Sequence, residues 1–279
     1  MTALNSGDTA GTTGAPVSGP QARPRGGDDL FANFRDFWHG YDAGAEPGER
    51  GGIEMYRSGV GGPLYNGVLR VTPGVGLAAA YEEATAWFAG LPATWWVGPD
   101  SDPRTSVFLR GQGLIPETEA MTVMEIDLEE VDAVRHPTGL TIRRVPDSED
   151  ITPWVRAYAP SMGVAPAALG TLAQRHAGRY DETGSFVRFE ARDGDRIVGT
   201  SALLDRRGVA GVYIVSTAEP YRGRGLGTAL TAAALLVGRE RGLDRGTLQT
   251  ATAAALYARM GFRAVAEYRM FSFNGRTGP

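Results

Sequence analysis

The chain has 279 residues, enough for two domains, and its 42% hydrophobic and 9% aromatic content is typical of a folded globular protein. Its formal net charge of −4 gives no indication of a nucleic-acid-binding surface, so no nucleic-acid partner is expected. It contains no cysteine, which excludes disulfides, thiol nucleophiles and thiolate metal sites.

Residues 1–27 are mostly small or polar and contain almost no large apolar side chain. Such a composition cannot bury enough surface to offset the entropy of ordering, so we expect a disordered leader. The leader has no apolar core, which excludes a signal peptide. The rest of the sequence contains no apolar run of 18 residues, so no membrane span is expected. We therefore expect a cytoplasmic protein without a membrane partner.

The next region, 28–130, begins with large apolar residues spaced three to four apart, which predicts an amphipathic helix over 28–40. The pattern then predicts strands at 53–57 and 67–71, a helix at 77–89, a strand at 94–97, a helix at 104–111 and a strand at 121–128. Residues 131–138, with His136-Pro137 inside, are the expected linker.

The region 139–275 restarts with a strand at 141–145. A helix is expected over 148–158, because Ser148 can cap it and two carboxylates would lie near its positive end. The remaining expected elements are a helix at 165–176, a hairpin of strands 186–191 and 196–204, a strand at 209–215, a helix at 228–241, a strand at 247–249, a helix carrying Tyr257 and a strand at 264–273.

The strand at 209–215 and the helix at 228–241 are joined by Tyr221-Arg222-Gly223-Arg224-Gly225-Leu226-Gly227. Glycines let the backbone curl so that its N–H groups converge on an anion. The helix adds unpaired N–H groups and the positive end of its dipole, and the two arginines add charge. The turn is therefore a candidate phosphate-binding site.

Three kinds of phosphate loop compete for this turn. A Walker loop needs a lysine, and the chain has none. A dinucleotide fingerprint needs Gly-x-Gly-x-x-Gly, but the last position holds Thr228 or Leu230 in the two possible registers. The third kind fits: Arg222-x-x-Gly225-x-Gly227 resembles the acetyl-coenzyme A loop of the GNAT superfamily of N-acetyltransferases.

A second motif supports the resemblance. About thirty residues after the loop comes Tyr257-Ala258-Arg259-Met260-Gly261-Phe262, similar to the Tyr-x-x-x-Gly-Phe helix of that family, and a strand follows it. The resemblance implies that acetyl-CoA is the co-substrate, without a metal, and that Tyr257 is the general acid. It further implies cofactor-binding roles for Val215 and Thr217 on the preceding strand, for Arg222, Gly223, Arg224, Gly225, Leu226, Gly227 and Thr228 in the loop, and, more weakly, for Thr250.

The general base stays open at this point. Many relatives carry a glutamate on the strand before the loop, and this strand has none. Glu190, Asp205, Tyr213 or an ordered water relay could serve. The three histidines, His39, His136 and His176, are expected to be structural or solvated because they show no ligand spacing.

The first region looks like a degenerate copy of the second. Gly76 matches Gly225 at an offset of 149 residues, and Gly113 matches Gly261 at an offset of 148. The copy lacks both loop arginines and the tyrosine. The predicted fold is therefore α/β, with two GNAT-like mixed α/β domains in tandem: a degenerate one over 28–130 and a catalytic one over 139–275. An unrelated α/β cap with accidental glycines is the alternative.

We therefore expect an N-acetyltransferase that moves an acetyl group from acetyl-CoA to a primary amine of a small molecule. A protein N-terminal acetyltransferase and a non-catalytic acyl-CoA-binding or regulatory module are the alternatives, and retention of Tyr257 argues against the last. Aromatic residues of the first region could line an acceptor cleft or belong to the core: Phe34, Trp38, Tyr41 and Tyr56. The sequence does not identify the acceptor, the acyl-chain preference or the oligomeric state.

Overall fold

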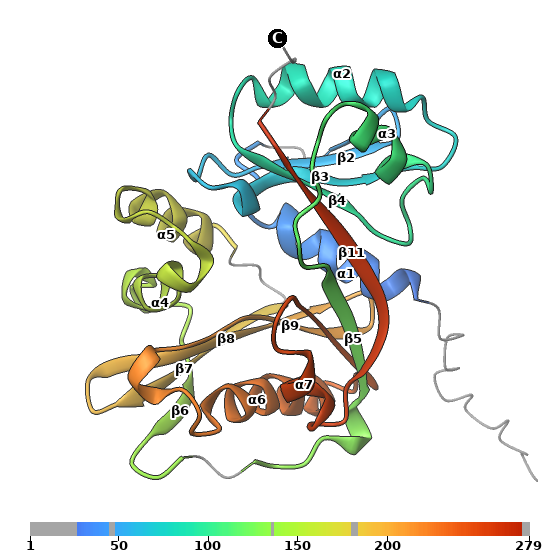
Figure 1. Cartoon of the computed structure of the whole chain (residues 1–279). Helices are drawn as coiled ribbons and strands as arrows, with labels where there is room; N and C mark the ends of the chain where they lie inside the picture. The colour runs from blue at the N-terminus through green and yellow to red at the C-terminus, as the bar shows by residue number, and fades with distance from the viewer. Residues whose placement is uncertain (1–26, 45–47, 135–136, 180–183, 275–279) are drawn as a thin grey trace, which may run out of the picture.

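The computed structural model describes residues 27–44, 48–134, 137–179 and 184–274, and these form a mixed α/β fold (Figure 1). Their strands make one continuous sheet of eleven strands in the order β1-β2-β3-β4-β11-β5-β10-β9-β8-β7-β6. The expected leader lies almost wholly outside the described residues, as does His136 in the expected linker. No helix in the described ranges is long and apolar enough to span a membrane.

The first half contributes one central helix, five strands and two further helices. Their bounds are α1 Asp28–His39, β1 Gly48–Arg50, β2 Ile53–Arg57, β3 Asn66–Val71, α2 Leu77–Phe88, β4 Ala93–Val97, α3 Thr105–Gly111 and β5 Met121–Asp127. Each element expected from the sequence in this half is present within one or two residues, and β1 is an additional short strand.

The second half contributes six strands and four helices in the described residues. Their bounds are β6 Thr141–Arg144, α4 Thr152–Tyr158, α5 Leu169–Ala177, β7 Phe186–Asp193, β8 Arg196–Arg206, β9 Val209–Thr217, α6 Leu226–Glu240, β10 Arg245–Thr250, α7 Ala254–Ala258 and β11 Arg263–Phe273. The prediction of a helix starting at Ser148 was wrong. The helix begins at Thr152, where the Asp150 carboxylate accepts the Thr152 N–H at 2.9 Å and a proline occupies the first turn.

The two halves exchange their last strands. Strand β11, from the end of the chain, lies between β4 and β5, and β5 lies between β11 and β10. All three pairings, β11–β4, β11–β5 and β10–β5, are antiparallel. Each half therefore completes the sheet of the other, and the long β11 crosses the middle of the molecule (Figure 1).

Helices cover the second half of the sheet on both faces. Helices α6 and α7 pack on one face, and α1, α4 and α5 lie on the other (Figure 1). Helix α1 is held there by Asn33, whose amide donates to the carbonyls of Leu204, Arg206 and Val209 at 2.9–3.2 Å. The amide oxygen of Asn33 also accepts the Tyr213 hydroxyl at 2.7 Å. This helix of the first half thus packs on the strand that leads to the glycine turn.

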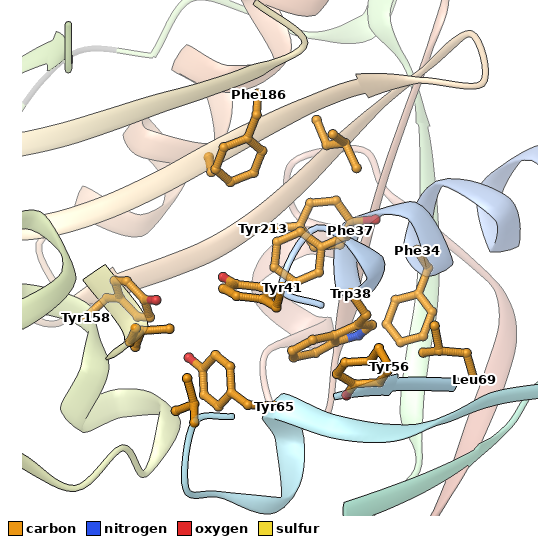
Figure 2. Close-up of a cluster of buried hydrophobic side chains, with 14 of the residues drawn as sticks. Phe34, Phe37, Trp38, Tyr41, Tyr56, Tyr65, Leu69, Tyr158, Phe186 and Tyr213 are labelled. Carbon is orange, nitrogen blue, oxygen red and sulfur yellow. The ribbon is translucent and has the colours of Figure 1, made fainter. Parts of the chain in front are cut away.

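Aromatic side chains fill the space between α1 and the two wings of the sheet (Figure 2). The ring of Phe37 stacks on that of Tyr213 with centroids 3.9 Å apart. The four aromatic residues that could have lined an acceptor cleft are at most 4% exposed and belong to this core: Phe34, Trp38, Tyr41 and Tyr56. A buried aromatic side chain of this size stabilises the fold by roughly 2–3 kcal/mol through its removal from water. Because the cluster contains residues of both halves, it stabilises their packing against each other.

Candidate active site

Strand β9 is distorted just before the glycine turn. Its pairing with β8 shifts register between Thr200 and Ala202, so that Ile214 and Val215 together oppose a single residue. Ile214 has φ +56°, a conformation that costs a β-branched residue about 1–3 kcal/mol. The buried hydroxyl of Thr200 donates to the Ile214 carbonyl at 2.9 Å and holds the distorted backbone in place. Strain maintained in this way next to a ligand-binding motif is typical of a functional bulge.

Strands β9 and β10 are joined along only part of their length. Their parallel pairing comprises Ala210–Gly246 and Gly211–Thr247, although β9 continues to Thr217. The β10-facing edge of β9 beyond Gly211 lies outside this ladder. An extended ligand inserted there could bond to backbone groups as a neighbouring strand would.

The glycine turn opens directly onto the start of α6. Gly223 has φ +72° and Gly225 φ +79°, conformations that only glycine adopts without strain. Gly225 is the N-cap of α6, and no side chain caps that helix. An ideal Cβ at either glycine would have no neighbour within 4 Å, so the space above them is open. The first N–H groups of a fifteen-residue helix are thus available to an anion, and the helix dipole adds to their attraction.

Two exposed arginines flank this turn. The Nε of Arg222 donates to the Thr217 carbonyl at 3.3 Å, and the Arg224 guanidinium lies 5.4 Å from the centre of the Tyr221 ring. The Tyr221 hydroxyl in turn donates to Asp193 at 2.7 Å, on the β7–β8 hairpin. Neither arginine forms a salt bridge with a described carboxylate. Both charges are therefore free to attract a phosphate.

Tyr257 lies in the hydrophobic core that α6 and α7 share. It is 8% exposed, and its ring packs edge-on against Phe262 with centroids 5.8 Å apart. Burial raises the pKa of Tyr257 above the ordinary phenol value, and the Thr231 hydroxyl on α6 offsets part of that rise. The phenol is consequently protonated at neutral pH and can act as an acid but not as a base.

Comparison with known proteins matches this part of the chain to one family. Residues 185–264 match the acetyltransferase (GNAT) domain model. Residues 185–264 form an acetyltransferase domain of the GNAT superfamily. Among solved structures, a GCN5-related N-acetyltransferase from Kribbella flavida matches 88% of this chain and 95% of its own at TM-score 0.63 and 18% identity. A tandem GNAT protein of the clavulanic acid biosynthesis pathway matches 90% and 97% at TM-score 0.56 and 17% identity.

Curated relatives point to the same family. A mycothiol acetyltransferase of Clavibacter sepedonicus is 30% identical over 210 residues, which are 69% of this chain and 66% of that protein. One of Mycolicibacterium paratuberculosis is 29% identical over 168 residues, which are 56% of this chain and 53% of that protein. The chain thus spans about half to two thirds of the length of these relatives.

The other GNAT-loop residues expected from the sequence lie around the same turn. Val215 and Thr217 are half-buried, and an ideal Cβ on Gly227 would lie 3.9 Å from a side-chain atom of each. Leu226 is buried in the core, so only its backbone can reach a ligand. Thr228 lies in the first turn of α6 and lines a hollow beside the end of α7.

Thr250 has a structural partner. Its hydroxyl oxygen accepts the Ala253 N–H at 2.9 Å, in the turn just before α7. It ends β10 and so lies between the diverging strand and the helix that carries Tyr257. The hydrogen bond of Thr250 thus helps to position α7.

None of the three candidate bases is poised to accept a proton. Glu190 is 1% exposed and bonds to Arg143 and Arg192 at 2.7–2.8 Å. Asp205 bonds to Arg241 at 3.2 Å. Burial raises the pKa of Tyr213 well above the ordinary value, and its hydroxyl already donates to Asn33. A water relay is the remaining candidate within the described part of the GNAT domain.

The first half has a counterpart of the GNAT turn between β3 and α2, but its surroundings differ. The Gly74 N–H donates to the Asp102 carboxylate at 3.4 Å. Asp102 is 2% exposed and pairs with Arg104 through a side-chain bond at 2.7 Å. The position that matches Tyr257 at an offset of 148 residues is Leu109, which is fully buried. The sequence reasoning missed Asp102, and it missed Thr200 and Ile214, because each acts through a contact that no local motif records.

Proposed function

We propose that the chain transfers an acetyl group from acetyl-CoA to a primary amine of a small molecule. The observation that carries the proposal is the conjunction, within one GNAT domain, of the open glycine turn, the strained bulge of β9 and the buried, protonated Tyr257. The curated relatives named mycothiol acetyltransferase support a small-molecule acceptor over a protein.

The residues of the site divide the work between binding and chemistry. The amides from Arg222 to Gly227 hold the pyrophosphate, and the two arginines add Coulombic attraction. The free edge of β9 around Val215 bonds the pantetheine arm and polarises the thioester carbonyl through a backbone N–H. The attacking amine loses its proton to water, and Tyr257 donates its phenolic proton to the sulfur as the C–S bond breaks.

The acid step requires geometry more than acidity. A phenol has an ordinary pKa of about 10 and a thiol one of about 8.5, so proton transfer from Tyr257 to a free thiolate is uphill. The transfer becomes favourable only as negative charge develops on sulfur in a site shielded from water. Burial of Tyr257 beside Phe262 supplies that shielding.

Protein N-terminal acetylation and silent acyl-CoA binding remain the alternatives. The purified chain should be incubated with acetyl-CoA and separate panels of small amines, carboxylated amines and peptides, with thiol release as the readout. Thiol release with free amines supports the proposal, and activity on peptides alone would replace it by the second reading. Binding of acetyl-CoA, seen by calorimetry, without turnover on any panel would favour a binding module.

A further inference from the structure

Arg179, just after α5, is a buried cation that forms no ion pair with any carboxylate among the described residues. Its residue is 9% exposed, and its guanidinium lies 4.2–4.8 Å from the ring centres of Phe37, Tyr41 and Phe186. One of its terminal nitrogens donates to the Phe37 carbonyl at 2.9 Å. The other, Nη1, is buried and has no hydrogen-bond partner. Rings stack favourably on a guanidinium but leave its in-plane N–H donors unsatisfied.

The local charge balance is positive. A second buried arginine, Arg188, also lies over the Phe186 ring, at 5.1 Å, and its carboxylate partner is Asp147 at 3.3 Å. Among the described residues, no carboxylate is within ion-pair distance of Arg179. An unpaired buried charge costs several kcal/mol, so proteins normally retain one only where something pairs with it.

Arg179 lines an open cleft of about 610 Å³ between α1, the first half of the sheet and the end of the β8–β9 hairpin. The acidic residues of that cleft are engaged elsewhere. Asp36 pairs with Arg207, Glu54 pairs with Arg35 and Arg70, and the Asp42 carboxylate accepts a backbone N–H. Among the described residues of this cleft, these acidic side chains thus leave Arg179 without a carboxylate partner.

The guanidinium of Arg179 packs directly against Gly40. An ideal Cβ at this position would lie 2.6 Å from Arg179 Cζ and Nη2. The backbone of Gly40 has φ −61°, which any residue adopts, so its conformation does not require glycine. The absent side chain matters here because it leaves room for the guanidinium at the wall of the cleft.

The cleft is remote from the glycine turn. It lies beside Leu204, which pairs with Gly211, whereas the turn follows Thr217, which pairs with Gly199. Six residues of strand separate Gly211 from Thr217, or about 20 Å. The cleft and the glycine turn therefore lie at opposite ends of β9.

We propose that this cleft is a second, non-catalytic binding site for a small molecule that carries a carboxylate or a phosphate, with Arg179 as its anchor. Both groups match the planar fork of a guanidinium and would give Arg179 the anionic partner that the described residues do not supply. The rings around Arg179 exclude water on the protein side, which strengthens the pairing. The site does not depend on the acetyl-transfer function.

The test measures thermal stability of the full chain in rising inorganic phosphate or propionate, with chloride keeping ionic strength constant. Saturating coenzyme A keeps the glycine turn filled, so that only a second site responds. We expect a saturable rise of the melting temperature in at least one anion series. The larger of the two responses identifies the headgroup that the site prefers.

Three variants locate the response. Arg179→Gln should weaken the apparent affinity by at least about tenfold, because a charge-assisted bidentate pair is lost. Gly40→Ala, whose backbone tolerates alanine, should weaken it too by displacing the guanidinium, and it decides the matter if Arg179→Gln does not fold. Arg156→Gln, which removes an exposed charge of α4 outside the cleft, should leave it within about twofold. A flat response of the wild type to both anions, or an unchanged response in Arg179→Gln and Gly40→Ala, overturns the proposal.

Discussion

The turn after β3 and the turn after β9 occupy the same place in the two halves, yet they offer an anion different surroundings. In the first half, the Asp102 carboxylate faces the Gly74 N–H and Arg104 neutralises it. In the second half, Arg222 and Arg224 border the turn, and neither pairs with a carboxylate of the described residues. We infer that the first turn faces a carboxylate of the protein itself, Asp102, whereas the second turn binds the anionic group of a ligand.

The chemistry of the following helices differs in the same direction. Helix α7 carries a phenol that can donate a proton, whereas α3 carries the aliphatic Leu109 at the matching position. Strand β9 has the strained Ile214, and among the described residues of β3 no residue has a positive φ. The comparison teaches that a fold can keep the strand–turn–helix for its packing after losing the donors and charges that a ligand needs.

The largest expected effect comes from matched substitutions in the two turns. Gly225→Glu should weaken coenzyme A binding by more than about 100-fold, because a carboxylate beside the pyrophosphate costs several kcal/mol. Gly74→Glu is the control, since Gly74 also has a positive φ, +94°, and open space around it. It should carry the same backbone strain and leave the affinity within about twofold. Calorimetry that finds equal losses in both variants would remove the distinction between the turns.

Tyr257→Phe should lower kcat by ~10²–10⁴-fold and leave the dissociation constant of acetyl-CoA almost unchanged, because the phenolic proton matters only as the thiolate leaves. The ring and its contact with Phe262 remain, so the melting temperature should change little. Steady-state kinetics with a titration of acetyl-CoA check this. A wild-type kcat at a rate-limiting chemical step would make Tyr257 a packing residue.

Thr200→Val tests whether the bulge of β9 matters. The valine keeps the shape but leaves the Ile214 carbonyl without its hydroxyl donor, a loss of about 1–3 kcal/mol of stability. If the bulge positions the backbone for the thioester, kcat should fall by about tenfold beyond any change in coenzyme affinity. Urea unfolding and kinetics on the same preparation separate the two effects, and lowered stability with unaltered kcat would assign Thr200 a purely structural role.

The smallest effect is expected from Asp102→Asn, in the loop between β4 and α3 that faces the turn after β3. The hydrogen bonds from Arg104 hold the pKa of Asp102 well below its usual range. A carboxylate with a lowered folded-state pKa contributes stability above its unfolded pKa of about 3.9, and that contribution is lost as the pH falls further. The variant should therefore unfold at a lower urea midpoint at pH 7, and the difference from wild type should shrink below about pH 4. Coenzyme affinity should not change, and a constant difference across the pH range would contradict the ion-pair account.

Local patterns predicted most of the elements and the candidate site. The loop from Arg222 to Gly227 and the Tyr257 helix are visible because glycine, arginine and tyrosine are needed at fixed short spacings. The strand exchange was not predictable, since β5 and β11 pair across more than a hundred residues and either half could have closed on its own strand. The start of α4 was missed because three adjacent polar residues, at 148–150, could each cap a helix, whereas the helix begins at Thr152 with Ile151 as its N-cap.

The central claim is that one half of this chain binds the coenzyme and the other does not. The most direct measurement is the stoichiometry of acetyl-CoA binding, by calorimetry on the purified full chain with an independently determined protein concentration. The account predicts one acetyl-CoA per chain, and none in Gly225→Glu. Two molecules per chain, or one that survives Gly225→Glu, would contradict it by showing that the turn after β3 still binds the coenzyme.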